Sequence, residues 1–303
     1  SNWDAGMDMY IYGKLGNLTM TKEGINVLMT NLTGKVPPIL QRLDYIRFNG
    51  EAAGYLHDLT LTGLFHTGAG MVKTDVMMSI DEQSMSRTYS GSVASADLDL
   101  GKLLNQEKKF GKVDFNVELK GFNYKNRYPE SYIKGIISSF EYSQYQYENI
   151  MLDGVYKDGG FNGRLSMDDA NGSVQIDGNF NVAKTIPDFN LKASVKNLRP
   201  HDLHLSDKYE NASISLGLTA DFTGKSIDDM NGRISLDSLQ LNAPDERGCF
   251  LDNLTITAGQ VSGEKELRIN SSFMTAVIRG DYSYHTIPAS VVKTVQRYIP
   301  SLL

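Results

Sequence analysis

Two stretches of the chain end in the lysine and hydroxyl residue that close a phosphate-binding loop. Such a loop holds phosphate with backbone N–H groups between a strand and a helix, and it requires glycine at fixed positions. In FTGKS, residues 222–226, Thr219 stands five positions before Gly224, where the loop requires glycine. In GNFNVAKT, residues 178–185, Ala183 replaces the second glycine. We therefore interpret both stretches as chance matches.

Histidine and carboxylate spacing gives only a weak signal for a metal. Of the five histidines, only His201 and His204 lie close together, and in an extended chain positions three apart point to opposite faces. A helical turn would align them, but a zinc site also needs a third ligand and a second shell. Asp168, Asp169 and Asn171 could imitate half of a calcium loop, but no glutamate closes it at the right distance. We expect solvated turns at both places, and no metal or cofactor.

Nucleophilic catalysis has no sequence support either. The chain contains no GxSxG elbow, and no histidine lies near the single cysteine, Cys249, in the sequence. Catalytic partners are often distant in sequence, so this observation weakens a hydrolase hypothesis without excluding it. We expect no catalytic residue and a protein that is not an enzyme.

Composition narrows the class of protein. The 303 residues are 41% hydrophobic, which is enough to build a core, and they carry a net charge of −6 with no basic stripe. We therefore expect no nucleic-acid partner. The sequence has no run of 18 apolar residues and no signal segment, so we expect nothing in it to span a membrane. Ser1 and Asn2 resemble the remnant of a removed tag, which would mean that the sequence starts inside a longer polypeptide.

The elements that must position any functional side chain are strands. In SVQIDGNFNV, residues 173–182, apolar and polar side chains alternate, and Gly178 alone interrupts the apolar row. Because successive side chains of a strand point to opposite faces, this strand has one apolar face. The same alternation occurs in five further stretches, at 112–121, 189–198, 212–222, 232–241 and 252–259. We therefore predict an all-β protein with a long, mostly antiparallel sheet and a few short helices.

Turn and glycine positions agree with this prediction. KDGG at 157–160 and DDANG at 168–172 have the chemistry of hairpin turns. Glycines also recur inside apolar strand runs, in LTLTGLF at 59–65 and in the runs MLDGVY, FNGRLSM and QIDGNFNV between 151 and 182. Because glycine in a strand marks a bulge or a bend, we expect a curved sheet.

Helical signals are confined to three places. Residues 21–43 could hold one or two short helices around a break at 34–38, and residues 99–106 one or two turns. At the C-terminus, apolar side chains recur with helical spacing opposite a polar face. These apolar residues are Val291, Val295, Tyr298 and Leu302. We predict two regions, a curled sheet over 1–285 and an amphipathic helix over 286–303.

The apolar face of such a sheet needs a cover. The sheet can pack on a second sheet, close into a barrel, or curl into a trough that holds an apolar molecule, and alternation alone does not choose among these. We predict that the apolar face is continuous across many strands. Its lining residues are Val174, Ile176, Phe180, Val182, Leu191, Val195, Ile214, Leu216, Leu218, Ile234, Leu236 and Ile256.

Tyrosines are dense in FEYSQYQYENI. Tyr142, Tyr145 and Tyr147 could form a stacking platform for sugars or bases. Tyrosine is also a common strand residue that covers a cross-strand neighbour, and we favour this structural interpretation.

Three parts of the chain resemble a known family. Residues 19–76 (TMTKEGINVLM…) look like a segment of the TamB-like proteins of Bacteroidota-type Gram-negative bacteria, which belong to the AsmA-like superfamily. Residues 90–121 (SGSVASADLDLGKLLNQ…) are similar to the unit that recurs in these proteins, a strand, a DLGKLL-type helical turn and further strands. The tail at 280–303 is similar to a stretch that follows this unit.

This resemblance implies a long periplasmic protein anchored in the inner membrane of a Gram-negative bacterium. Its β-rich body would form an open, U-shaped trough with an apolar lining, and phospholipid acyl chains would be the partners of that lining. This chain shows neither the anchor nor a recognisable end domain, so the resemblance implies an internal piece. An outer-membrane barrel protein would be a partner of the parent chain.

From the resemblance we expect a non-enzymatic segment that binds or conducts phospholipid acyl chains between the inner and outer membranes, or that supports outer-membrane protein assembly. A structural or adhesive β module on the cell surface is the alternative. The two hypotheses differ in whether the apolar face is open.

Overall fold

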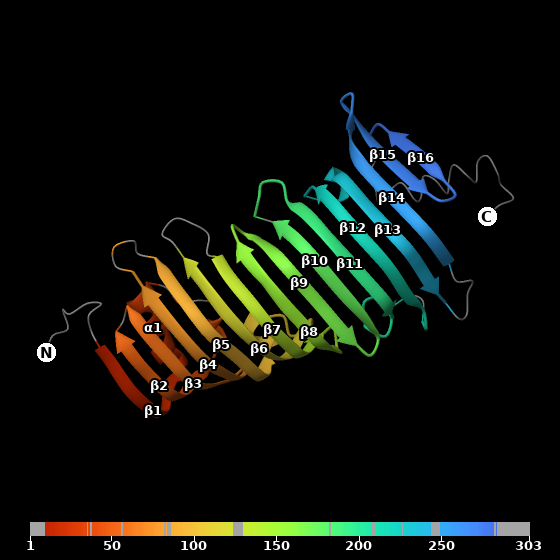
Figure 1. The fold of residues 1–303 in the computed structure, drawn as a ribbon. Coiled ribbons are helices and arrows are strands. Elements are labelled where there is room, and N and C mark those ends of the chain that lie inside the picture. Colours follow the sequence, from red (N-terminus) through yellow and green to blue (C-terminus); the bar gives the residue numbers. More distant parts are fainter. Residues whose placement is uncertain are drawn as a thin grey trace.

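The chain folds into one long antiparallel sheet of sixteen strands (Figure 1). The computed structural model describes residues 10–34, 36, 38–55, 57–81, 83, 86–123, 130–181, 183–207, 210–225, 227–243, 249–281 and 283. Strand order in the sheet equals order in the chain, so each strand pairs with its neighbours in sequence. The predicted all-β, antiparallel fold is confirmed.

The strands are β1 Tyr10–Thr21, β2 Tyr45–Tyr55, β3 Asp58–Thr67, β4 Gly70–Ile80, β5 Arg87–Asp99, β6 Phe110–Asn123, β7 Glu130–Tyr142, β8 Tyr145–Lys157, β9 Gly160–Asp169, β10 Gly172–Asn181, β11 Asp188–Leu198, β12 Ser213–Thr223, β13 Asn231–Asn242, β14 Cys249–Val261, β15 Glu264–Ser271 and β16 Thr275–Arg279.

The sheet is open and curled. β1 and β16 lie at its two ends and do not pair with each other, so the described strands form neither a closed barrel nor a sandwich of two sheets. In Figure 1 the ribbons of β5 to β8 turn at the lower side of the sheet and continue, fainter, behind it. We call the hollow of this curled sheet the trough.

Cross-strand register assigns the strand residues to two faces. Phe48 pairs with Phe65, and Phe65 with Val72; we call the face that carries these three residues the inner face. Thr62 pairs with Asp75 on the opposite, outer face, where the Thr62 hydroxyl donates a hydrogen bond of 2.9 Å to the Asp75 carboxylate. The predicted alternation therefore separates apolar from polar side chains.

One edge of the sheet carries both α-helices. Helix α1, Lys22–Thr33, and the 3-10 helix η2, Leu40–Arg42, join β1 to β2, while α2, Leu100–Leu104, joins β5 to β6. These elements confirm the short helices predicted near 21–43 and 99–106. We call this side of the sheet the helix edge, and the opposite side, where β2 turns into β3, the hairpin edge.

Capping residues set the bounds of both α-helices. The Thr21 hydroxyl accepts a hydrogen bond from the Gly24 N–H at 3.4 Å, and α1 ends at Gly34, which has a left-handed φ of 75°. The Asp99 carboxylate accepts from the Lys102 N–H at 2.8 Å, and α2 ends at Asn105 with a φ of 57°. Side-chain acceptors at the N-terminus and left-handed residues at the C-terminus are the usual signals.

The helices pack on the inner face of the first seven strands. Ile25 of α1 is 2% exposed, and Leu103 of α2 is buried with it in a cluster that includes Leu98 and Val113 of the sheet. Phe140 of β7 is partly buried against this cluster. The chain itself thus covers the inner face along the helix edge here, whereas Leu119 and Ile133, towards the hairpin edge, are half-buried.

A second cover lies further along the helix edge, in the connection 199–212 between β11 and β12. Leu203 is fully buried, and its carbonyl accepts a hydrogen bond of 2.7 Å from the Tyr147 hydroxyl of β8. The Arg199 N–H donates to the Asn171 carbonyl at 2.9 Å. The turn predicted at 201–204 is present, but it is not merely solvated, because it anchors Leu203 on the strands before it.

Bulges bend several strands near the helix edge. The register shifts at Asp97 of β5, Asn197 of β11 and Ser238 of β13, and these residues have left-handed φ angles of 56°, 47° and 52°. An extra residue in one strand increases the local twist and bends that strand. The bulges therefore contribute to the curl of the sheet.

Glycines predicted to mark curvature lie side by side on the inner face. Gly154 pairs with Gly163, and Gly163 with Gly178. A Cβ atom on Gly163 would lie 2.3 Å from the Asp153 carbonyl oxygen and 3.0 Å from the Phe161 ring. The Phe161 ring thus lies close over glycine backbone, which a side chain at 163 would prevent.

The predicted hairpin turns are also present. Asp158 and Gly159, with left-handed φ angles of 51° and 76°, join β8 to β9, and Ala170 and Asn171 join β9 to β10. The amphipathic helix predicted over 286–303 lies outside the described residues.

Candidate functional site

The register places the predicted lining residues on the inner face. Val174 pairs with Val195 and Val195 with Leu216, while Ile234 of β13 pairs with Ile256 of β14. Val182 lies outside the described residues. The remaining eleven predicted residues share this face in β10 to β14: Val174, Ile176, Phe180, Leu191, Val195, Ile214, Leu216, Leu218, Ile234, Leu236 and Ile256.

These side chains have no second layer above them among the described elements. Ile176, Leu216 and Ile256 are half-buried, and Phe180 is 40% exposed. Helices α1 and α2 pack on β1, β2 and β6. From β9 to β13, the part of the chain that the structure describes leaves most of the inner face to a single layer of apolar side chains, whereas Ala258 of β14 and Leu267 of β15 are buried.

An aromatic row runs along the hairpin edge of this inner face. Tyr156, Phe161, Phe180, Phe189 and Phe222 follow one another in register across β8 to β12. The ring centroids of Phe161 and Phe180 lie 5.8 Å apart, and those of Phe189 and Phe222 4.8 Å apart in a stacked arrangement. Sequence reasoning included only Phe180, although strand parity also marks the other phenylalanines.

The tyrosines of the β7–β8 turn serve the fold. Tyr147 is 8% exposed and bonds Leu203, as described above. The Tyr145 hydroxyl donates to the buried Asp169 carboxylate at 2.5 Å. Burial, together with this hydrogen bond to Asp169, raises the pKa of Tyr145 to about 12. Both hydroxyls are committed to the protein, which agrees with the structural interpretation and argues against a stacking platform.

The phosphate-loop matches lack the required architecture. Gly178 to Asn181 lie inside β10, and Gly224 lies between β12 and the three-residue 3-10 helix η3, Ile227–Asp229. Neither match joins a strand to an α-helix, so neither presents convergent N–H groups at a helix N-terminus.

The side chains considered as metal ligands either lie apart from one another or already make contacts within the protein. The Nδ1 atom of His204 lies 2.8 Å from the Ser143 carbonyl, and the Nδ1 atom of His201 lies 3.6 Å from the Asp202 carboxylate. Asp169 accepts hydrogen bonds from Tyr145 and from the N–H groups of Glu148 and Asn171. In the described ranges, no three His, Cys, Asp or Glu side chains gather as a metal site would require.

Charges on the outer face alternate in sign across neighbouring strands. Lys134 lies 3.3 Å from Asp153, and Arg164 lies 2.5 Å from Asp177. Hydrogen bonds from Tyr132 and Lys134 hold the pKa of Asp153 below its ordinary value. This face is therefore suited to water, in contrast to the inner face.

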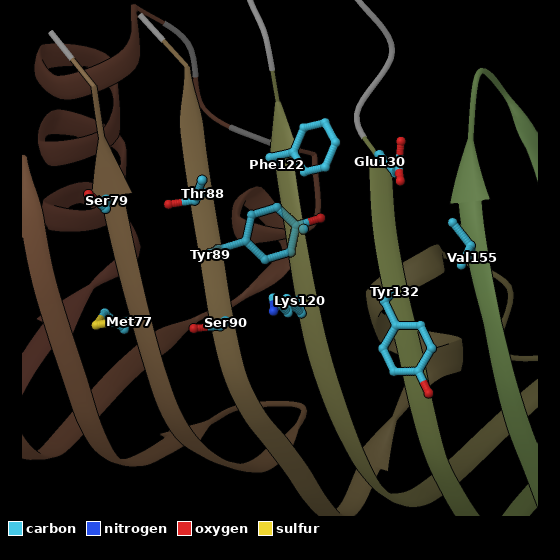
Figure 2. A pocket seen from close by; sticks show the side chains of 11 residues that line it. Met77, Ser79, Thr88, Tyr89, Ser90, Lys120, Phe122, Glu130, Tyr132 and Val155 are labelled. Carbon is cyan, nitrogen blue, oxygen red and sulfur yellow. The ribbon is translucent and has the colours of Figure 1, made fainter.

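Two hollows interrupt the polar character of the outer face. The first has a volume of about 370 Å³, and Figure 2 shows its lining side chains on neighbouring strands. The outer-face residues among them are Met77, Ser79, Thr88, Ser90, Lys120, Phe122, Glu130, Tyr132 and Val155. Tyr89 and Gly121, which stand at inner-face positions, complete the lining. The second, of about 470 Å³, includes Lys134, Ile136, Met151, Asp153 and Arg164. Sequence reasoning missed both hollows, because Met77, Ile136 and Met151 stand at the polar positions of their strands.

None of the described helices has the length and hydropathy needed to cross a membrane. Comparison with protein-family models, with curated proteins and with solved structures gave no match.

Proposed function

We propose that the inner face of the trough binds the acyl chains of phospholipids. The observation that carries this proposal is the continuous apolar row of β10 to β14, which the described elements leave without a second layer. The face is apolar and concave, and a lipid tail needs no specific polar partner, so a lining of aliphatic and aromatic side chains suits it.

The energetic argument concerns water on this face. If several hundred Å² of apolar lining stayed wet, the cost at about 25 cal/mol per Å² would be on the order of 10 kcal/mol, comparable with the stability of a whole domain. An acyl chain lying along the trough removes water from the lining and from itself. Both surfaces therefore favour the bound state.

The dimensions of the sheet also suit lipid. Sixteen strands at about 4.8 Å spacing extend for about 70 Å, roughly twice the hydrocarbon thickness of a bilayer. The trough therefore has room for several acyl chains in sequence. This length supports conduction along the sheet better than storage of a single ligand.

We further propose that the chain is a non-enzymatic, periplasmic segment of a TamB-like protein of the AsmA-like superfamily. Its parent would be anchored in the inner membrane and would carry phospholipid towards the outer membrane or support the assembly of outer-membrane proteins. The resemblance of residues 19–76 and 90–121 supports this assignment, as does the open, curled sheet.

The test is native mass spectrometry of the purified chain, followed by lipid extraction. We expect phospholipid to copurify, and Leu216→Asp to reduce the bound amount, because a carboxylate on the inner face would meet the acyl chain. Thr219→Asp is the matched control, since Thr219 lies on the outer face of the same strand, opposite Lys192 and Ser235.

Lipid-free wild-type protein would contradict the proposal, and so would equal lipid content in both variants with unchanged circular dichroism. Those outcomes would favour a structural or adhesive β module whose own side chains fill the trough.

A further inference from the structure

The outer face differs sharply between two groups of strands. From β9 to β13 its side chains are polar at every described position except glycines. From β4 to β8 it exposes large apolar side chains instead: Met77 is 49% exposed, Ile136 50% and Met151 52%. Apolar side chains that gather on an otherwise polar face, as Tyr132 and Val155 do in register, are typical of a binding site.

The two hollows in this region differ in their charges. In the second hollow, Lys134 is paired with Asp153 and Arg164 with Asp177, so its cations are committed. In the first, Glu130 is held by Lys157 at 2.8 Å. Lys120 of the first hollow makes no ion pair with any described residue, although it lies in register between Ser90 and Tyr132.

The walls around Lys120 are largely apolar. Phe122 lies two residues further along the same strand, and Tyr132 and Val155 pair with each other on the next two strands. Figure 2 shows Lys120 between Ser90 and Tyr132, with Phe122 and Tyr132 on different sides of it. The hydroxyls of Thr88 and Ser90 add hydrogen-bonding groups on the β5 side.

We propose that this first hollow is a second binding site, which takes a small amphipathic carboxylate. The apolar body of the ligand packs against Phe122, Tyr132 and Val155, and its carboxylate pairs with the Lys120 ammonium. The volume of about 370 Å³ lies within the usual range for small-molecule sites. The single uncommitted cation selects an anion over a neutral molecule of the same shape. This site lies on the opposite face of the sheet from the trough and does not depend on lipid binding there.

The test uses two probes of the same shape, 2-naphthoate and its neutral amide, in calorimetric titrations of the full chain. We expect saturable binding of 2-naphthoate by the wild type, and about tenfold weaker binding after Lys120→Met, which removes the charge and keeps most of the stem. The amide should bind both proteins equally. Lys192→Met on β11 is the matched control, because Lys192 lies on the outer face and makes no ion pair with any described residue.

Two further variants locate the probe. Val155→Asp in the hollow should abolish naphthoate binding, and Phe180→Asp on the inner face should leave it unchanged. The proposal is wrong if the wild type shows no saturable binding, if Lys120→Met and Lys192→Met weaken it equally, or if only Phe180→Asp removes it. The last result would assign the probe to the trough. Thermal melts of all variants would exclude unfolding as the cause of lost binding.

Discussion

The helix-covered part of the sheet, β1 to β7, and the bare part, β9 to β14, have the same strand pattern and different surroundings. In the first, α1 and α2 bury Ile25 and Leu103 against the inner face. Strand residues of the first part at the helix edge, such as Leu98 and Val113, are buried, whereas inner-face residues of the second, such as Leu236, remain half-buried. Identical alternation therefore builds a core in one region and an apolar face that the described elements leave largely uncovered in the other, and the connections between strands make the difference.

The largest expected effect is on stability. Ile25→Ala in the covered part should lower the free energy of unfolding by about 3 kcal/mol, because it leaves a cavity in a closed cluster. Leu236→Ala in the bare part should lower the free energy of unfolding by about 1 kcal/mol. The loss is smaller because the Leu236 side chain is only half-buried in the folded chain. Urea denaturation of both variants measures the difference. Equal losses would mean that the bare part is covered in solution.

The amount of copurified phospholipid, unlike the stability, should respond most strongly to substitutions in the bare part. Phe180→Asp is expected to reduce copurified phospholipid roughly fivefold, because the new carboxylate faces the acyl chain, and its effect on the fold should be small at 40% exposure. The control is Asn179→Asp, which adds the same charge to the outer face of β10. Asn181 is a poorer control, because its side chain bonds the Asp158 carbonyl. Mass spectrometric lipid counts that fall in both variants would remove the inner face from the mechanism.

Glycine-to-alanine substitutions should change the stability in opposite directions in the two parts. Gly163→Ala in the bare part should destabilise the chain by about 2 kcal/mol, because its Cβ would lie 2.5 Å from Gly154 Cα. Gly24→Ala in α1 meets only an ordinary contact of 3.8 Å and should stabilise by about 0.5 kcal/mol through helix propensity. Thermal melts would show shifts of opposite sign. A neutral Gly163→Ala would indicate that the glycine row is not needed for the close strand approach.

The smallest expected effect concerns pH, at the boundary between the two parts. The pKa of Tyr145 is raised to about 12 in the folded chain, above an unfolded value of about 10. Folding therefore favours the neutral phenol, and this contribution is complete below about pH 10 and is lost as pH rises through about 12. Tyr145→Phe should cost about 1 kcal/mol at neutral pH and flatten the alkaline loss.

The measurement for this last prediction is a series of melting temperatures between pH 8 and 12. Tyr12→Phe, at a site 67% exposed, serves as control and should retain the wild-type slope. An unchanged slope in Tyr145→Phe would show that the Tyr145–Asp169 hydrogen bond does not govern the alkaline transition.

The face to which each strand side chain points and the residues that cap the helices could be predicted from the sequence. Alternation around Ile176, Leu216 and Ile256 gave a common face, because side-chain direction in a strand depends only on local geometry. Thr21 and Asp99 mark helix starts by their own side-chain hydrogen bonds. These features need no knowledge of distant residues.

Features that depend on packing between distant segments could not be predicted in the same way. Leu203 is fully buried because the 199–212 connection reaches Tyr147, more than fifty residues earlier in the chain. The open form of the sheet was expected from family resemblance alone, since alternation fits a barrel equally well. The outer hollow around Lys120 was missed because it combines side chains of five strands that share no sequence motif.

Pairing between sequence neighbours alone makes the sheet a modular array. A hairpin such as β9–β10 contacts only the strand before it and the strand after it through backbone hydrogen bonds. Adding or deleting one hairpin would change the length of the trough by about 10 Å and leave its cross-section intact. The reach of such a protein can thus change by duplication of strand pairs, as the length of a repeat protein does, without redesign of the lining.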